Sequence, residues 1–405
     1  MPKKEVSPIE KLVHEAALQT QEQLVQVQHK QHSLFIGIPK EITMQENRVP
    51  LSPSSVSFLV NNGHRIIIET KAGSNANFSD TEYSEAGAQI AYSPEEVYAA
   101  DILLKIDPPT LGEVDMMKPQ QLLISALQLN NLDELIIRKL IAKKVHALAY
   151  EYLEDNSGSL PIIRAMSEIA GHASILIAAD YLTNSHIGKG ELLGGFAGIP
   201  PTQIVIIGAG SVGEYAAKAA IGLGANVKVF DSSPYRLRRI QSNIGQRIYT
   251  STIHPNALRK ALMVADVAIG ALRSDKDRAP CVVTEEMVMQ MKPKSVIIDV
   301  SADKGGVFET TRITNHEKPI YKEHDVIHFA VPNIPSRVSR TASYALSNIF
   351  TPILMDICDY GSYSEYIRHN CGSKAGTYLL NGTLTNSILG EKYKLTSKNI
   401  DFLLL

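Results

Sequence analysis

Three glycines and one acid, placed at fixed spacing around predicted strands, give the clearest chemical signal in the chain. Gly208, Gly210 and Gly213 follow an apolar β-branched run at 204–207, and Asp231 ends the next such run. The first glycine permits a tight turn, the second lets the backbone approach a pyrophosphate, and the third lets a helix pack on the strand. Phosphates would then lie at the positive N-terminus of that helix. The residues expected to bind a dinucleotide here are Gly208, Gly210, Ser211, Val212 and Gly213.

Asp231 bears on the choice of cofactor. An acid at this position can accept hydrogen bonds from a ribose diol and would repel a 2′-phosphate, which favours NAD over NADP. Arg236 lies close enough in sequence to offset that repulsion, although a solvated helix arginine is the simpler interpretation. A purely structural glycine turn is the alternative for the whole segment.

Four further polar residues stand at or near the ends of apolar segments. The guanidinium of Arg48 can hold a carboxylate through two hydrogen bonds, and Lys105 can polarise a carbonyl or bind a carboxylate. Asp303 is an acid just beyond a predicted strand, and Asn333 can hydrogen-bond a carboxamide or a substrate. Each also has a structural interpretation, as a snorkelling surface charge, a turn or cap acid, or a turn residue before a proline.

The elements that position these residues follow a βα pattern. Short β-branched runs alternate with longer helical stretches, which indicates mostly parallel sheets. The first series of predicted strands covers 35–38, 65–69, 102–106, 122–125 and 146–149, and the second covers 204–207, 226–230, 267–269 and 296–300. The expected fold class is α/β, with two Rossmann-like domains, each a mostly parallel sheet with helices on both faces, and a cleft between them.

This pattern predicts three parts. Residues 1–33 form an N-terminal helical extension, 34–165 plus 341–405 form a discontinuous substrate (catalytic) domain, and 166–340 form the NAD-binding Rossmann domain. An Ala- and Ile-rich helical stretch at 168–193 joins the lobes, and a helical segment at 341–366 returns to the first. The extension has a modest apolar stripe, which fits docking on a neighbouring subunit, a cover for its own domain, or a frayed arm.

Composition excludes several functional classes. The 405 residues carry 40 basic and 42 acidic side chains, for a net charge of −2. Such a balanced charge does not indicate binding to nucleic acid or to anionic lipid. The 3 cysteines lack CxxC spacing, so neither a disulfide framework nor a metal site is expected. No uninterrupted apolar run is long enough to span a membrane, and no signal-peptide core follows the first residues. A reducing cytoplasm is the expected compartment.

Taken together, these segments resemble the alanine dehydrogenase and NAD(P) transhydrogenase alpha-subunit family, from about Phe35 to about Ser387. The resemblance implies that Arg48 and Lys105 bind the substrate carboxylate and carbonyl, and that Asp303 is the catalytic acid near the nicotinamide. It also implies cofactor or substrate contacts for Ser167 and Asn333, and a homo-oligomer. The blocks that correspond, in order, are 37–53, Leu104-Lys105, 166–171, 192–195, 208–213, 299–306 and 333–335.

One departure from the family pattern concerns catalysis. Alanine dehydrogenases carry a catalytic histidine where this chain has Gln128, and glutamine can orient a carbonyl or water but cannot exchange a proton near neutral pH. Transhydrogenase alpha subunits also have glutamine there, and 333–337 resembles theirs. Against this, the chain lacks their Arg/Gln/Asp loop, and 192–199 is dehydrogenase-like. His172 is interpreted as a helix residue rather than a replacement acid.

The resemblance therefore implies an NAD-dependent oxidoreductase that deaminates a small L-amino acid, most simply L-alanine to pyruvate and ammonia, reversibly. Asp303, Lys105 and Gln128 are the expected catalytic group, with Lys105 sharing the proton-transfer role if burial lowers its pKa. Alternatives are a soluble NAD(H)-binding subunit of the transhydrogenase alpha type, a reductase like saccharopine dehydrogenase, or a noncatalytic homologue.

Overall fold

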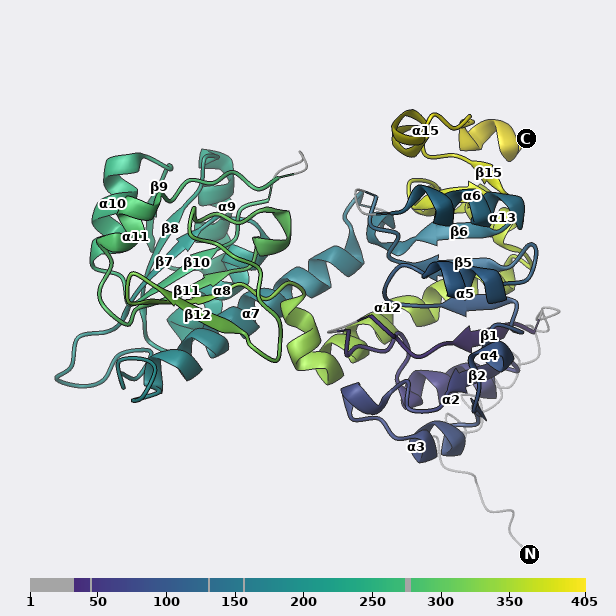
Figure 1. Ribbon diagram of the computed structural model, residues 1–405, viewed down its shortest axis with the longest axis horizontal. Helices are drawn as coiled ribbons and strands as arrows, with labels where there is room; N and C mark the ends of the chain where they lie inside the picture. Colours follow the sequence, from purple (N-terminus) through teal and green to yellow (C-terminus); the bar gives the residue numbers. More distant parts are fainter. Residues whose placement is uncertain (1–32, 44–45, 130–131, 156, 274–277) are drawn as a thin grey trace, which may run out of the picture.

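The computed structural model shows two α/β lobes joined by two long helices, α7 (Pro161–Thr183) and α12 (Ser339–Asp359) (Figure 1). It describes residues 33–43, 46–129, 132–155, 157–273 and 278–405. The predicted fold class is confirmed, since each lobe is built on a mostly parallel sheet with helices on both faces. Nearly all of the predicted N-terminal extension, residues 1–32, lies outside the described residues.

The first lobe contains an eight-stranded sheet in the order β15-β14-β6-β5-β4-β1-β2-β3. Its strands β1 to β6 pair in parallel, while β14 and β15 add antiparallel at one edge. The strands are β1 (Phe35–Ile38), β2 (Arg65–Glu69), β3 (Gln89–Ala91), β4 (Ile102–Leu104), β5 (Leu122–Ser125), β6 (His146–Ala149), β14 (Thr377–Leu380) and β15 (Thr383–Leu384).

Side-chain alternation along these strands forms two cores. Ile36 and Leu104 face one core with α2 and α12, while Leu103 and Leu123 face the other with α4, α5 and α6. The helices of this lobe are α2 (Pro53–Asn61), α3 (Asp80–Glu85), α4 (Pro94–Val97), α5 (Leu111–Met116), α6 (Glu134–Ala142), α13 (Tyr363–His369), α14 (Cys371–Lys374) and α15 (Ser387–Tyr393), with single 3₁₀ turns η1 (Ser74–Ala76), η2 (Tyr150–Tyr152) and η5 (Ile400–Leu403).

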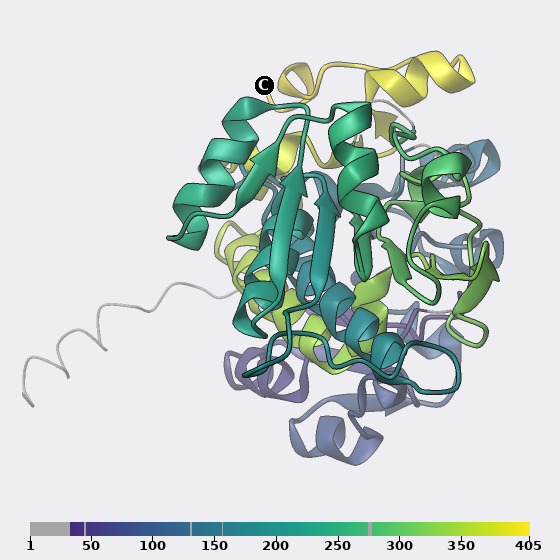
Figure 2. The ribbon, with the colours of Figure 1, turned by 90° about the vertical axis from the view of Figure 1, so that its left-hand side faces the viewer.

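The second lobe contains a seven-stranded sheet in the order β12-β13-β11-β10-β7-β8-β9, in which only β12 runs antiparallel. Figure 2 shows this lobe in front, with helices on either side of its strands. The strands are β7 (Gln203–Ile207), β8 (Asn226–Phe230), β9 (Tyr249–Ser251), β10 (Val267–Gly270), β11 (Val296–Asp299), β12 (Ile320–Glu323) and β13 (Val326–Phe329).

This sheet is also buried on both faces. Ile204 and Ile206 pack with the helices α7, α8 and α9, while Val205 and Ile207 pack with α10 and α11. Continuous apolar strands of this kind are typical of a parallel sheet covered on two sides. The helices are α8 (Ser211–Gly222), α9 (Pro234–Ile244), α10 (Pro255–Met263) and α11 (Glu285–Met289), with 3₁₀ turns η3 (Ala302–Lys304) and η4 (Ile334–Val338).

The two joining helices each belong to one core. The buried face of α7 packs mainly on the second sheet and on α8, whereas Leu346, Phe350 and Leu354 of α12 pack on the first sheet. Gly171 of α7 lies so close to α8 that an added Cβ would stand 2.5 Å from the Val212 carbonyl oxygen. By length and apolar composition α7 could cross a membrane, but 44% of its most apolar window is buried inside the protein. The packing is that of a core helix.

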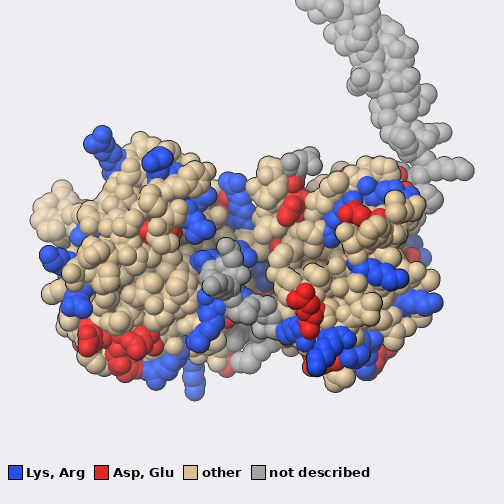
Figure 3. All heavy atoms as spheres, turned by 90° about the horizontal axis from the view of Figure 1, so that it is seen from above, with Lys and Arg blue, Asp and Glu red and all other residues tan. Residues whose placement is uncertain are grey.

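Both lobes carry mixed surface charge. Figure 3 shows Lys and Arg side chains interspersed with Asp and Glu over the face seen from above, without one sign covering it. The three cysteines are all free thiols, two exposed and one buried.

Candidate active site

The candidate substrate-binding residues of the first lobe share one edge of its sheet. β1, β4, β5 and β6 are parallel neighbours, so the loops that follow them leave the sheet on the same side. Arg48 lies beyond β1, Lys105 directly follows β4, and Gln128 follows β5. Carboxyl ends of parallel strands are where open α/β folds bind ligands.

Arg48 is held by a carboxylate of its own loop. Its Nε donates to Glu46 Oε1 at 2.7 Å and its Nη2 donates to Glu46 Oε2 at 2.6 Å, in a bidentate pair. Nη1 lies 3.3 Å from Met166 Sδ. Burial lowers the pKa of Arg48, but the Glu46 carboxylate more than compensates and raises it. These contacts use three of the five N–H donors of the guanidinium, so it retains donors for a substrate carboxylate.

Glu46 also joins the two lobes. Asn333, which follows β13 in the second lobe, donates from Nδ2 to Glu46 Oε2 at 2.8 Å. The neighbouring backbone N–H of Asn47 donates to Ser336 Oγ at 2.8 Å. Asn333 has a left-handed backbone, with φ of 59°, which Asn tolerates better than most residues. The predicted substrate residue Arg48 and the predicted cofactor residue Asn333 therefore share one acceptor.

Lys105 is buried between two carboxylates. Its side chain is 1% exposed, and Nζ lies 2.8 Å from Glu113 Oε1 and 3.1 Å from Glu41 Oε2. Burial alone lowers the pKa of a lysine, but Glu41 and Glu113 outweigh that effect, and the pKa of Lys105 is raised. The condition for a proton-transfer role, a net lowering of this pKa, is therefore not met, because the partner carboxylates stabilise the ammonium form. The surroundings of Lys105 favour its charged state.

Gln128 lies in the loop after β5, against a half-buried glutamate. Its side chain is exposed, and its backbone adopts φ of 45°. Its backbone N–H donates to Glu151 Oε1 at 2.7 Å, and the N–H of Leu127 donates to Glu151 Oε2 at 3.2 Å. Burial raises the pKa of Glu151 to about 7, against the lowering effect of these hydrogen bonds. The loop therefore places a carboxyl with a near-neutral pKa next to Gln128.

The glycine turn of the second lobe has the geometry that its spacing predicts. Gly208 has φ of 119°, and a Cβ there would stand 2.3 Å from the Ala271 carbonyl oxygen. A Cβ on Gly213 would stand 1.8 Å from the Gly208 carbonyl oxygen, so only glycine lets α8 begin this close to the turn. Gly210 has nothing within 4 Å of an added Cβ. The second glycine thus faces open space, where a pyrophosphate can approach.

Three other predicted cofactor residues lie around the start of α8. Ser211 and Val212 form its first turn, and both are half-buried. Ser167 lies four residues before Gly171, on the same side of α7, the side that packs on Val212. His172, one residue after Gly171, packs its ring against Tyr215 of α8.

Asp231 follows β8 and is fully buried. Its Oδ2 accepts from the Ala209 N–H at 2.7 Å, and its Oδ1 accepts from the Ser233 N–H at 2.8 Å. Arg239 donates to the Ala209 carbonyl oxygen at 3.1 Å. Arg236 is exposed on α9, as expected for a solvated helix residue. Asp231 therefore fixes the glycine turn in this structure, and a carboxylate has further lone pairs that a diol can use.

Asp303 lies in the 3₁₀ turn after β11, at the carboxyl edge of the second sheet. It is exposed, yet surrounding protein atoms raise the pKa of its carboxyl, an effect that Lys304 and Arg273 oppose. The loop is organised by buried Asp299, which accepts hydrogen bonds from the N–H groups of Ser301 and Val307. Asp303 thus lies in a loop whose backbone is held by hydrogen bonds to Asp299.

Arg273 relates this loop to the first lobe. Its positive charge acts on the Asp303 carboxyl and on the Tyr152 hydroxyl, opposing the rise in pKa of both. Tyr152 belongs to η2, immediately after β6. The loops that carry Gln128 and Glu151 therefore lie on the side of the first lobe that faces the Asp303 loop of the second lobe.

Several residues at this site are absent from the sequence-based prediction. Glu46 lies 2 residues from Arg48 and Glu113 lies 8 residues from Lys105, whereas Glu41 lies 64 residues from Lys105. The sequence does not show which of the many carboxylates meets each of the predicted residues. The one local signal is the capping box at the start of α5, where Glu113 caps Thr110 and also contacts Lys105. The residues missed are Glu41, Glu46, Glu113, Glu151 and Asp299.

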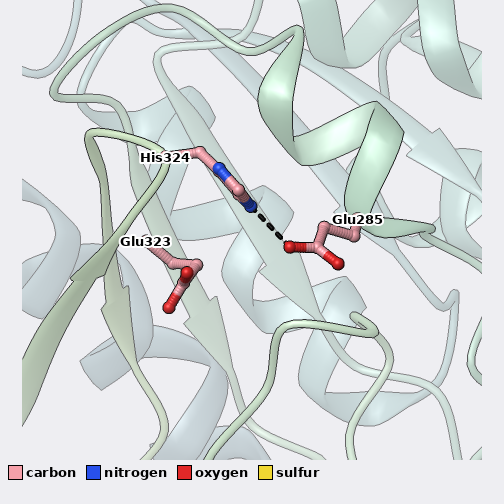
Figure 4. Close-up of side chains that lie close together, drawn as sticks. All are labelled: Glu285, Glu323 and His324. Carbon is pink, nitrogen blue, oxygen red and sulfur yellow. Dashed lines mark hydrogen bonds and ion pairs between the residues drawn. The ribbon is translucent and has the colours of Figure 1, made fainter.

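Two features lie away from this edge. Glu285, Glu323 and His324 lie together at the start of α11 and the turn between β12 and β13 (Figure 4), with ligand atoms within 4.8 Å of one another. His324 contacts Glu285 at 2.7 Å, and Glu323 pairs with Arg312, so this surface cluster is satisfied by ion pairs. A pocket of about 380 Å³ lies between α10 and strands β8 and β9. Neither feature includes a predicted site residue.

Known proteins resemble both parts of the chain. The model of the alanine dehydrogenase/PNT N-terminal domain matches residues 37–170, and that of the C-terminal domain matches 174–387. Alanine dehydrogenase 2 of Staphylococcus aureus (strain USA300) is 40% identical over 367 residues, which cover 90% of this chain and 98% of that protein.

Solved structures agree with the sequence comparison. A structure of L-alanine dehydrogenase superposes with a TM-score of 0.82 at 36% identity, covering 91% of this chain and 99% of that one. A transhydrogenase from Sinorhizobium meliloti shares the fold, with a TM-score of 0.73 at 23% identity over 86% of this chain and 98% of its own. The chain belongs to the alanine dehydrogenase/PNT family.

Proposed function

We propose that this protein catalyses the reversible NAD-dependent oxidative deamination of L-alanine to pyruvate and ammonia. The observation that carries the proposal is the 40% identity to an alanine dehydrogenase over 90% of the chain. The structure supports it with two buried cationic side chains at the edge of one sheet and a dinucleotide-type glycine turn at the edge of the other.

The first lobe is proposed to bind the amino acid. Arg48, steadied by Glu46, would bind the substrate carboxylate through its remaining N–H donors. Lys105, held charged by Glu41 and Glu113, would bind the carboxylate or the carbonyl oxygen of the 2-oxo acid. Two fixed cations at one sheet edge orient the Cα hydrogen, and such orientation supplies much of a rate enhancement.

The second lobe is proposed to bind NAD, which accepts the Cα hydride at its nicotinamide ring. The open space at Gly210 and the N-terminus of α8 suit a pyrophosphate, with Ser211, Val212 and Ser167 around it. Asp231 is proposed to bind the adenosine ribose, and Asn333 the nicotinamide side or the substrate. On this proposal residues 166–340 form the cofactor domain, and 34–165 plus 341–405 the substrate domain.

Asp303 is proposed to assist the proton transfers of the reaction. Its raised pKa means that the carboxyl accepts a proton more readily than an ordinary surface aspartate. The side chain of Gln128 would orient the carbonyl or the attacking water by hydrogen bonding, without exchanging a proton itself.

The protein is also proposed to act as a cytoplasmic homo-oligomer without nucleic-acid or membrane partners. Leu192, Phe196 and Ile199 are 68%, 69% and 65% exposed. Their loop lies against the turn of Leu223, because Gly194 approaches the Leu223 carbonyl oxygen closely. An apolar surface of this kind marks a protein interface. Light scattering of Phe196→Asp, expected to show smaller particles than the wild type, tests it.

Gln128 supports one alternative function, a subunit of the transhydrogenase alpha type that binds NAD(H) and exchanges hydride with a partner protein. The two functions are distinguished by steady-state NADH formation from L-alanine and NAD with the purified protein alone. Turnover supports the deaminase; NADH binding without turnover supports the alternative.

A further inference from the structure

Glu151 occupies the edge of the first sheet where the proposed reaction needs a titratable group. It lies two residues after the end of β6, and Lys105 directly follows β4. Both of its carboxylate oxygens face the loop after β5, accepting from the N–H groups of Leu127 and Gln128 at 3.2 and 2.7 Å. The carboxyl is therefore fixed beside Gln128, which has no proton to exchange near neutral pH.

Three tyrosines lie close enough to the Glu151 carboxyl for its charge to shift their pKa values. The charge of Glu151 raises the pKa of Tyr150 and Tyr152 on its own segment, and of Tyr378 on β14. Two cations act on these tyrosines, Arg48 on Tyr150 and Arg273 on Tyr152. Burial raises the pKa of Glu151 to about 7. Both protonation states are thus accessible at neutral pH.

Glu151 is also connected to the proposed substrate residues. The Tyr150 hydroxyl donates to the Ile106 carbonyl oxygen at 2.7 Å, which joins the segment after β6 to the segment after β4. The charges of Arg48 and Glu46 both act on the pKa of the Tyr150 hydroxyl: Arg48 lowers it and Glu46 raises it. One continuous group of side chains therefore runs from the guanidinium of Arg48 to the carboxyl of Glu151.

We propose that Glu151 is the proton-exchanging group of the first lobe, in the role for which Gln128 is unsuited. This inference rests on the proposed deaminase function. After hydride loss from Cα, water adds to the imino carbon: a C–O bond forms, the C=N π pair moves to nitrogen, and the Glu151 carboxylate takes one water proton. The resulting carboxyl returns that proton to the nitrogen. The C–N bond then breaks as the carbonyl forms, and ammonia leaves with the hydroxyl proton as ammonium.

The test is the pH dependence of kcat/KM for L-alanine oxidation by the full chain. The wild type is expected to gain activity as pH rises through about 7, because the carboxylate is the form that accepts a proton. Glu151→Gln should lose about 100-fold in kcat and lose this pH limb, a loss typical for one acid–base group. Glu151→Asp, which keeps a titratable carboxyl, should retain the limb at reduced rate.

Two further variants separate chemistry from structure. Glu154→Gln changes an exposed glutamate three residues away and should leave the profile unchanged. Gln128→His in the Glu151→Gln background should restore activity at least 10-fold, because it supplies a group that titrates near pH 6.5. NADH binding by fluorescence verifies that each variant is folded.

The outcomes distinguish this inference from the function on which it rests. A pH limb that survives in Glu151→Gln, or an equal loss in the Gln and Asp variants, would assign Glu151 to loop positioning and overturn the inference alone. Absence of alanine turnover by the wild type at every pH, with NADH bound, would overturn the proposed function and this assignment together.

Discussion

Asn333 of the second lobe donates a hydrogen bond to Glu46 of the first lobe at 2.8 Å, and the same glutamate accepts two hydrogen bonds from one edge of the Arg48 guanidinium. A single carboxylate thus couples the proposed cofactor residue to the proposed substrate residue. Any change in its charge should affect both partners.

Glu46→Gln is expected to destabilise the protein and weaken substrate binding. It leaves the buried guanidinium of Arg48 without its counter-charge, which costs about 3–5 kcal/mol of unfolding free energy for a buried pair. Urea unfolding measures this cost, and KM for L-alanine should rise. Glu134→Gln, which breaks an exposed pair with Arg138, is the matched control and should cost less than about 1 kcal/mol. Equal effects of the two substitutions would show that Glu46 has no special role.

Lys105→Met should abolish alanine turnover, by about 100-fold or more, while NADH binding remains. The substitution keeps the length of the side chain but removes the charge that lies between Glu41 and Glu113. Lys139→Met, which breaks an exposed contact with Asp115, is the control. Turnover near the wild-type rate in Lys105→Met would exclude Lys105 from substrate binding.

The glycine turn offers a paired test. Gly213→Ala should prevent stable folding of the second lobe, because its Cβ would stand 1.8 Å from the Gly208 carbonyl oxygen. Gly210→Ala should leave the unfolding free energy nearly unchanged, since nothing lies within 4 Å of the added atom. It should nevertheless weaken NADH binding at least 10-fold, by filling the space proposed for the pyrophosphate. Fluorescence titration measures this affinity. An unchanged affinity for NADH would show that the pyrophosphate binds elsewhere.

The raised pKa of the buried Glu41 carboxyl should make the stability of the protein depend on pH. Burial raises its pKa to about 7 in the folded protein, above the unfolded value of 4.5, so the folded state holds an extra proton between those values. The free energy of unfolding should therefore fall as pH rises through this window, by on the order of 3 kcal/mol from this group. Urea unfolding at pH 5 and pH 8 measures the slope.

The matched variants for this slope are Glu41→Gln, which should lose the contribution, and Glu95→Gln, an exposed change that should preserve it. A slope that is the same in wild type and Glu41→Gln would show that Glu41 titrates normally in the folded protein.

The sequence predicted the strands that carry strong local patterns. Apolar β-branched runs specified β1, β2, β7 and β8 almost to the residue, and the glycine spacing specified the turn before α8. Strands β3, β9, β12 and β15 were missed because they are short or polar strands near the sheet edges, and β13 was missed although it is an interior, fully buried strand. β14 was missed although all four of its residues are buried, because it pairs antiparallel with a strand more than two hundred residues earlier.

The site was predictable only in part, for the same reason. Arg48, Lys105 and Asn333 stand out locally, but the partners that set their chemistry do not. Glu46 and Asn333 are 287 residues apart, and Glu41 and Lys105 are 64 apart. The direction of the Lys105 pKa shift therefore could not be predicted: an apolar run indicates burial, whereas only the fold shows two carboxylates at the ammonium.

The most direct test of the proposed deamination is steady-state NADH formation from L-alanine and NAD by the purified full-length protein, with Asp303→Asn measured alongside. We expect turnover by the wild type and a loss of about 100-fold in Asp303→Asn, whose NADH affinity should be unchanged. A wild type that binds NADH but forms none from L-alanine would contradict the proposed deaminase. An undiminished rate in Asp303→Asn would remove that residue from the mechanism.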